Sequence, residues 1–145
     1  ICLLLAQISS AKEFNLSSPD QQIEVVLSLD SNIGILVIHK SHEIVRLNDI
    51  SLEVEGEDFN SAISKTRKVE TGTINRWIYP PIKERYSRIN EAFNDLTIRF
   101  RGDYGLIVRA FNDGIAYRFQ TFFKDSLVIG RENMRRRQTW LRVAM

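Results

Sequence analysis

The sequence contains few of the residues from which metal and redox sites are built. Cys2 is the only cysteine among 145 residues, so neither an internal disulfide nor a cysteine-rich metal site is available to the chain. His39 and His42 are the only histidines, and they bridge the end of an apolar run and a turn without fixing a third ligand. We interpret both histidines as exposed turn residues and predict no metal ligand and no cofactor in this chain.

The signatures of common catalytic sites are also missing. The chain has no G-x-S-x-G elbow, no Walker loop and no dinucleotide fingerprint. The acidic run at residues 53–58 lacks the ligand spacing of a calcium loop, and a solvated strand end explains its composition. A glycosidase needs two carboxyl groups about 5 to 10 Å apart across a pocket, which a sequence pattern does not establish. The sequence therefore predicts no catalytic residue.

Positive charge is concentrated in residues 131–145. They hold five arginines and one acid, and without them the 20 basic and 18 acidic side chains fall to 15 and 17. The body of the protein therefore gives no electrostatic reason to bind nucleic acid. Hydrophobic alternation also stops after Gly130, which leaves two interpretations of residues 131–145: a basic tail, or the product of a shifted reading frame.

The first eleven residues have the pattern of the end of a signal peptide. An apolar run precedes small residues, with Ser9 and Ala11 at the −3 and −1 positions of a signal-peptidase site. The alternative is that residues 2–6 form a first strand of the core. We favour a signal-peptide remnant at residues 1–11, which predicts an exported protein, periplasmic or at the cell surface. No apolar run is long enough to span a bilayer as a mature segment.

Apolar side chains that alternate with polar ones are abundant in the sequence. The alternation covers residues 23–29, 96–100, 106–111 and 115–119, and turn signals separate these segments. No segment of ten or more residues has a helical period. The length suits one domain with a sizeable core. The sequence therefore predicts an all-β fold, an antiparallel β-sandwich.

The Asn-Asp-Gly stretch at residues 112–114 predicts a hairpin between the last two of these segments. Gly114 is expected to take a positive φ, because glycine does so at no steric cost. If these strands pair in register, Arg99, Arg109 and Arg118 share one sheet face. Such a row is usually a solvated face with carboxylate partners. The alternative is a contact between domains, where arginine is enriched.

Trp77 and Tyr79 lie in a less regular stretch just before Pro80 and Pro81. Two successive prolines exclude a central strand or helix at that point. Because flat aromatic rings stack on sugars, Trp77 and Tyr79 are the candidate carbohydrate-binding residues. The competing interpretation places both rings in the core or at an interface, since large aromatic side chains are mostly buried.

Three stretches of the chain resemble the amino-terminal domain of glycoside hydrolase family 97. They are SPDQQIEVVLSLD at residues 18–30, RWIYPPIKERYSRINEAFNDLTIRF at 76–100 and RAFNDGIAYRF at 109–119, of which the last is the most specific. The similarity covers about residues 17–130 and ends where the arginine-rich segment begins.

The resemblance implies an exported bacterial α-glycosidase of the α-glucosidase or α-galactosidase type. Such an enzyme consists of an amino-terminal β-supersandwich of galactose-mutarotase-like fold, a central (β/α)₈ barrel and a carboxy-terminal β domain. The family's general acid, its base or nucleophile and its calcium-binding glutamates belong to segments that no position here matches. Residues 12–130 are then an incomplete supersandwich without a catalytic residue. Its partners are the barrel, the carboxy-terminal domain and, for the whole enzyme, an oligosaccharide substrate.

A second function, from a different class, is also consistent with the residues. The chain would then be a stand-alone secreted β-sandwich that binds carbohydrate or protein without catalysis. Trp77 and Tyr79 are the residues that favour it.

The signal-peptide interpretation can be tested on exported material. Intact-mass analysis should show a mature chain that starts at Lys12, because cleavage after Ala11 removes only residues that precede the alternating core segments. An exported protein that retains Ile1 would contradict this interpretation.

Overall fold

The structure is a computed structural model that describes residues 12–55, 65–82, 86–124, 126 and 128–138. The signal-peptide remnant predicted at residues 1–11 lies outside the described residues, as do residues 56–58 of the acidic run. Within the described ranges no helix is long and apolar enough to cross a membrane. The strands are Lys12–Ser17 (β1), Ile23–Leu29 (β2), Ile33–His39 (β3), His42–Val54 (β4), Thr66–Ile78 (β5), Ile89–Phe100 (β6), Tyr104–Phe111 (β7), Ile115–Thr121 (β8) and Ile129–Gln138 (β9).

One antiparallel sheet contains five strands in the order β1-β2-β3-β4-β9. Every second side chain of β2 and of the first part of β3 is buried. The register pairs Val25 with Val37 and Leu27 with Ile35, so the buried side chains of both strands lie on the same face. The alternation of the sequence at residues 23–29 is therefore the buried face of this sheet.

The other antiparallel sheet contains four strands in the order β5-β6-β7-β8. Its strand β7 is buried at six of its eight positions, with only Arg109 and Phe111 partly exposed. Such near-continuous burial requires cover on both faces of the strand. One face of β7 contacts the first sheet through β2, and the other carries Ile107, which is also buried.

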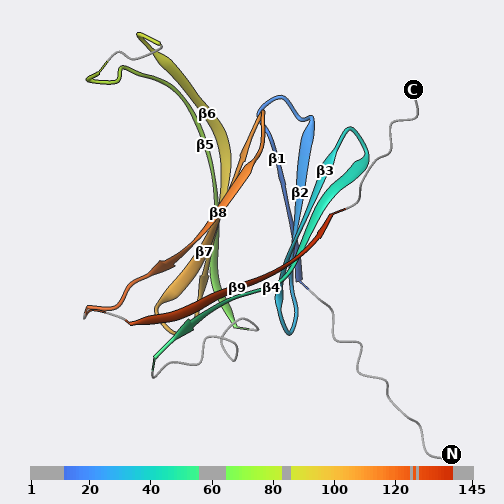
Figure 1. Cartoon of the computed structure of the whole chain (residues 1–145), viewed down its shortest axis with the longest axis vertical. Helices are drawn as coiled ribbons and strands as arrows, with labels where there is room; N and C mark the ends of the chain where they lie inside the picture. Colours follow the sequence, from blue (N-terminus) through green and yellow to red (C-terminus); the bar gives the residue numbers. More distant parts are fainter. Residues whose placement is uncertain (1–11, 56–64, 83–85, 125, 127, 139–145) are drawn as a thin grey trace, which may run out of the picture.

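The two sheets pack face to face around one apolar layer (Figure 1). The all-β antiparallel sandwich predicted from the alternation is confirmed. The largest fully buried side chains of this layer are Val25, Leu27, Ile33, Ile35 and Ile50 from the first sheet and Leu96, Ile98, Tyr104, Leu106 and Val108 from the second.

Two asparagine side chains connect the sheets at one end of the sandwich. Asn94 of β6 donates a hydrogen bond to the Ser17 carbonyl over 2.8 Å. The side-chain oxygen of Asn112 accepts one from the Asp20 N–H over 3.1 Å. The buried Ser18 hydroxyl donates to the Asp20 carboxylate over 2.6 Å, and this bond lowers the pKa of Asp20 below its ordinary value. The turn after β1 is thus attached to both β6 and the β7–β8 hairpin.

The arginine-rich segment is part of the first sheet as far as residue 138. Strand β9 pairs antiparallel with β4, with Leu47 opposite Arg136 and Leu52 opposite Glu132. Residues 131–138, for which the sequence left open a basic tail or the product of a shifted reading frame, thus form most of strand β9. Five of the six side chains at residues 131–136 are exposed, so β9 presents no buried face and no alternation marks it. Residues 139–145 lie outside the described residues.

The hairpin between β7 and β8 is present, but Gly114 does not have the conformation that the sequence predicts. Ala110 lies opposite Ile115, and the Phe111 N–H donates to the Gly114 carbonyl over 2.8 Å. Among the described glycines only Gly102 has a positive φ, at 111°, so the predicted positive φ at Gly114 is wrong. The two residues between Phe111 and Gly114 also have negative φ, and the turn closes without left-handed backbone.

The two glycines provide a matched pair of substitutions. Gly102→Val should lower the free energy of unfolding by about 1 to 3 kcal/mol, because the valine meets steric strain at a positive φ. Gly114→Val should change it by less than about 0.5 kcal/mol, since a Cβ at Gly114 meets nothing within 4 Å. Urea unfolding of both variants in one buffer checks this. Equal midpoints for the two variants would contradict the backbone assignment.

Candidate functional site

Strands β5 and β6 extend beyond the sandwich as a two-stranded hairpin (Figure 1). Eleven of the 13 residues of β5 are exposed, and its far end pairs only with β6, through Trp77 opposite Asn90 and Ile78 opposite Ile89. We call the exposed apolar side chains of this hairpin and its tip the aromatic arm: Trp77, Ile78, Tyr79, Ile82, Tyr86 and Ile89.

The two candidate carbohydrate-binding residues both lie on the aromatic arm. Trp77 is 51% exposed and Tyr79 is 70% exposed, so the interpretation of these rings as core residues is wrong. The Arg88 guanidinium carbon lies 4.4 Å from the centre of the Trp77 ring and covers one face of the indole. Beside them Arg76 and Glu91 form an ion pair of 2.6 Å across the two strands. On the aromatic arm, Trp77 is therefore covered on one face by Arg88, while Tyr79 is largely exposed.

Arg99, Arg109 and Arg118 share one face of the second sheet, as predicted from the alternation. The register places Arg109 opposite Ala116, and Ile107 opposite Arg118, so their side chains project from the face that points away from the sandwich core. We call these three residues the arginine face. Two of its guanidinium groups lie over phenylalanine rings at 4.4 Å, Arg109 over Phe93 and Arg99 over Phe122.

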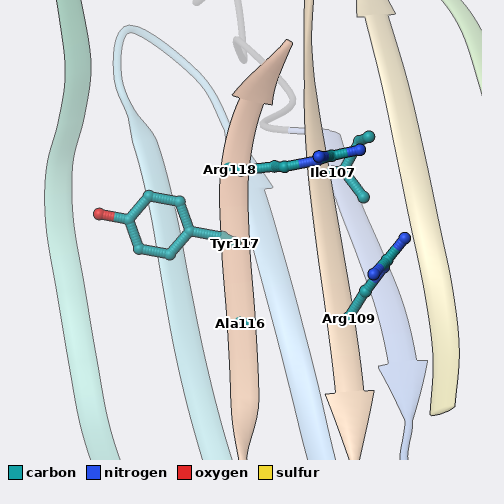
Figure 2. A pocket seen from close by; sticks show the side chains of 5 residues that line it. All are labelled: Ile107, Arg109, Ala116, Tyr117 and Arg118. Carbon is teal, nitrogen blue, oxygen red and sulfur yellow. The ribbon is translucent and has the colours of Figure 1, made fainter. Parts of the chain in front are cut away.

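Arg109 and Arg118 border a small hollow on this face. Its volume is about 100 Å³, and its lining is Ile107, Arg109, Ala116, Tyr117 and Arg118. In Figure 2 both guanidinium groups project to the same side of the strands, while the Tyr117 ring projects to the opposite side. Burial raises the pKa of Tyr117, whose hydroxyl lies 3.6 Å from the sulfur of Met134 in β9. The hollow is thus apolar at its base and cationic at its edge.

The guanidinium of Arg109 has unused hydrogen-bonding capacity. Its Nε is buried and has no hydrogen-bond partner. Asp95 lies directly opposite Arg109 across the strand pair, yet its carboxylate lies over Gly72 of β5, on the far side of β6. Of the four ion pairs found among the described residues, none involves the arginine face. The pKa of Glu70 in β5 is lowered by its hydrogen bond to Lys68 and also by the charge of Arg99, so Arg99 has the predicted carboxylate neighbour. Arg109 and Arg118 form no ion pair within the described part of the chain.

The histidines lie in the turn between β3 and β4. His39 pairs with His42 across the strands, and Lys40 and Ser41 between them have positive φ. The Nδ1 atom of His42 lies 2.8 Å from the Lys40 carbonyl, which occupies that ring nitrogen. In the described ranges no three His, Cys, Asp or Glu side chains come together as metal ligands.

Glu53 of the acidic run accepts a hydrogen bond from Asn133 over 2.8 Å, which links β4 to β9.

A larger groove opens beside the β7–β8 turn, and the sequence did not predict it. Its volume is about 430 Å³, and its walls are formed mainly by apolar side chains of the first sheet. Because its residues come from distant segments, only the packing of the two sheets brings them together. The groove is lined by Ile23, Val37, His39, Ile44, Val45 and residues 112–115.

These features define the class of the protein as an antiparallel β-sandwich domain whose distinctive side chains lie on its outward surfaces. Residues 16–137 match the family described as Glycosyl-hydrolase 97 N-terminal. The chain therefore belongs to this family of amino-terminal domains. The match extends through most of β9, so the predicted end of the similarity near residue 130 is corrected.

Similar proteins are much longer than this chain. It is 27% identical over 120 residues to a retaining alpha-galactosidase of Bacteroides thetaiotaomicron, an alignment that covers 82% of this chain and 18% of that protein. A family 97 enzyme from Pseudoalteromonas sp. strain K8 in complex with panose has the same fold, with a TM-score of 0.70 and 22% identity over 83% of this chain and 20% of that one. Its acarbose complex gives a TM-score of 0.68, 23% identity and the same coverage.

The exposure of Trp77 gives a stability test of the aromatic arm. Trp77→Ala should cost no more than about 1 kcal/mol of unfolding free energy, because the ring loses mainly its contact with Arg88. Phe100→Ala should cost about 3 to 5 kcal/mol, because Phe100 is 2% exposed within the core. Denaturant unfolding compares the two variants. A cost for Trp77→Ala as large as that for Phe100→Ala would show that the ring belongs to the core.

Proposed function

We propose that this chain is the non-catalytic amino-terminal scaffold domain of an exported bacterial α-glycosidase, of the α-glucosidase or α-galactosidase type. The observation that carries the proposal is the family match over residues 16–137. The chain spans only about a fifth of the similar enzymes, 18% of one and 20% of another. In this proposal the domain supports the assembly of the other four fifths of the enzyme. The pattern at residues 1–11 supports export.

The names of the similar proteins support α-linked sugars as the substrate of the longer enzyme. One is described as a retaining alpha-galactosidase, and the solved structures are described as complexes with panose and acarbose. Panose is an oligosaccharide of α-linked glucose, so these ligands favour the α-glucosidase type, while the curated relative favours the α-galactosidase type. We therefore propose α-glycosides as the substrate class of the longer enzyme.

We assign the catalytic groups to the polypeptide that follows this domain in the longer enzyme. By resemblance, the general acid, the base or nucleophile and the calcium-binding glutamates all belong to later segments. The described residues do not fit a calcium site, because no three acidic or histidine side chains converge. No catalytic or calcium-dependent step is therefore derived for this chain. Its contribution is structural, through the aromatic arm and the arginine face.

A stand-alone sugar-binding module is the second candidate, and the exposure of Trp77 and Tyr79 favours it. Stacking of sugar rings on these side chains requires direct binding by the isolated chain. Calorimetric titration with panose would show heats that disappear in Trp77→Ala and persist in the control Tyr104→Phe, which changes a buried ring. A reading frame that continues beyond Met145 into alternating strands and helices would favour the scaffold instead.

The scaffold proposal predicts that this chain alone hydrolyses no α-glycoside. Release of p-nitrophenol from its α-glucoside and α-galactoside should equal that of a heat-inactivated control, because the acid and the base or nucleophile are assigned to later segments. The longer enzyme that carries this domain should hydrolyse at least one of the two substrates. Activity of the short chain well above the control would overturn the proposal.

A further inference from the structure

The cations of the arginine face differ from the four described cations that form ion pairs. Elsewhere Arg46 pairs with Glu43 over 2.8 Å and Lys68 with Glu70 over 2.7 Å. Ion pairs also hold Arg76 and Arg135. The three guanidinium groups of the arginine face have no carboxylate within ion-pair distance in the described part of the chain. Two of them, those of Arg99 and Arg109, lie over phenylalanine rings.

Apolar side chains lie beneath these cations on the outward face of the sheet. Phe93 and Ile107 are 3% and 7% exposed although neither belongs to the apolar layer between the sheets. Phe93 packs against Phe111 with ring centres 5.1 Å apart. This outward sheet face thus combines apolar side chains with guanidinium groups that form no ion pair. Protein interfaces have the same composition, because aromatic residues and arginine are enriched in them.

We propose that the arginine face docks onto an acidic surface of the polypeptide that follows this domain in the longer enzyme. An aspartate or glutamate side chain of that surface enters the hollow between Arg109 and Arg118, with apolar neighbours on Ile107. A carboxylate matches the planar fork of a guanidinium, and one such group supplies the acceptor that the buried Nε of Arg109 lacks. This inference rests on the proposed function, because that function supplies the partner.

The partner is specified by charge and by length. Three cations on one face favour acidic side chains in the partner. On the same face the Asp95 carboxylate lies over Gly72, and Glu70, whose pKa is lowered by its hydrogen bond to Lys68 and by the charge of Arg99, forms its ion pair with Lys68. About four fifths of the length of each similar enzyme lies outside the part that this chain matches, since the chain covers 18% and 20% of them. That remaining chain is covalently attached and therefore present at a high effective concentration.

Arginine-specific labelling tests the proposal directly. Phenylglyoxal is applied to this chain alone and to the longer enzyme, and modification of each arginine is followed by mass spectrometry. Arg118 should be labelled about tenfold or more slowly in the longer enzyme than in the short chain, because a buried charge pair must open before the reagent reaches it. Arg67 and Arg101, both exposed, serve as controls whose labelling should not change.

A charge substitution provides the second measurement. Arg118→Glu should lower the Tm of the longer enzyme by several degrees but leave the Tm of the short chain unchanged, because its partner is absent there. Arg101→Glu makes the same charge change in an exposed turn and should affect neither protein. Hydrolysis of α-glycosides is measured separately, so an inactive longer enzyme would count against the proposed function and not against docking.

Three outcomes would overturn the docking proposal. Equal labelling of Arg118 in the short chain and the longer enzyme would show that the face stays exposed. Protection of Arg118 already in the short chain at high concentration would show that a second copy covers it. A loss of Tm for Arg118→Glu that is equal in both proteins would show that Arg118 acts within the domain.

Discussion

The apolar layer between the two sheets is the interaction on which the rest of the structure depends. Strand β7 is its centre, because Tyr104, Leu106 and Val108 are at most 1% exposed and β7 pairs with a neighbour on each side. Burial of apolar side chains supplies most of the favourable free energy of folding. Without this layer the arm and the arginine face would have no rigid support, since a two-stranded hairpin alone is only marginally stable in water.

Polar contacts then fix how the sheets lie relative to each other. An apolar layer is non-directional, whereas hydrogen bonds require defined geometry. Asn94 and Asn112 make such bonds from the second sheet to the turn after β1, at the backbone of Ser17 and Asp20. Two of the stretches that resemble the family, residues 18–30 and 109–119, therefore contact each other through Asp20 and Asn112.

Hydrophobic alternation predicted the strands that have one buried face, because side-chain period and burial coincide in β2, β6 and β8. It could not predict β9, since a strand at the sheet edge with exposed side chains has no apolar period. It also placed Arg109 and Arg118 on one face but not the carboxylate of Asp95, whose direction depends on the space above Gly72. The sequence left the exposure of Trp77 open, because large aromatic rings are mostly buried. In the structure Trp77 is exposed, since it lies near the end of β5, which pairs only with β6.

The buried Nε of Arg109 connects the stability of the domain to its proposed role. A buried donor without a partner costs about 1 to 3 kcal/mol relative to one that is hydrogen-bonded. The isolated domain carries this cost because Arg109 is held over Phe93 and its Nε cannot reach solvent. A docked carboxylate would remove the cost only in the assembled enzyme. Folding of the domain and docking of its partner are then linked equilibria. The free energy that docking adds to the stability of the folded domain equals the free energy that the folded domain adds to docking. A non-catalytic domain of this kind contributes to the enzyme through the stability of the assembly.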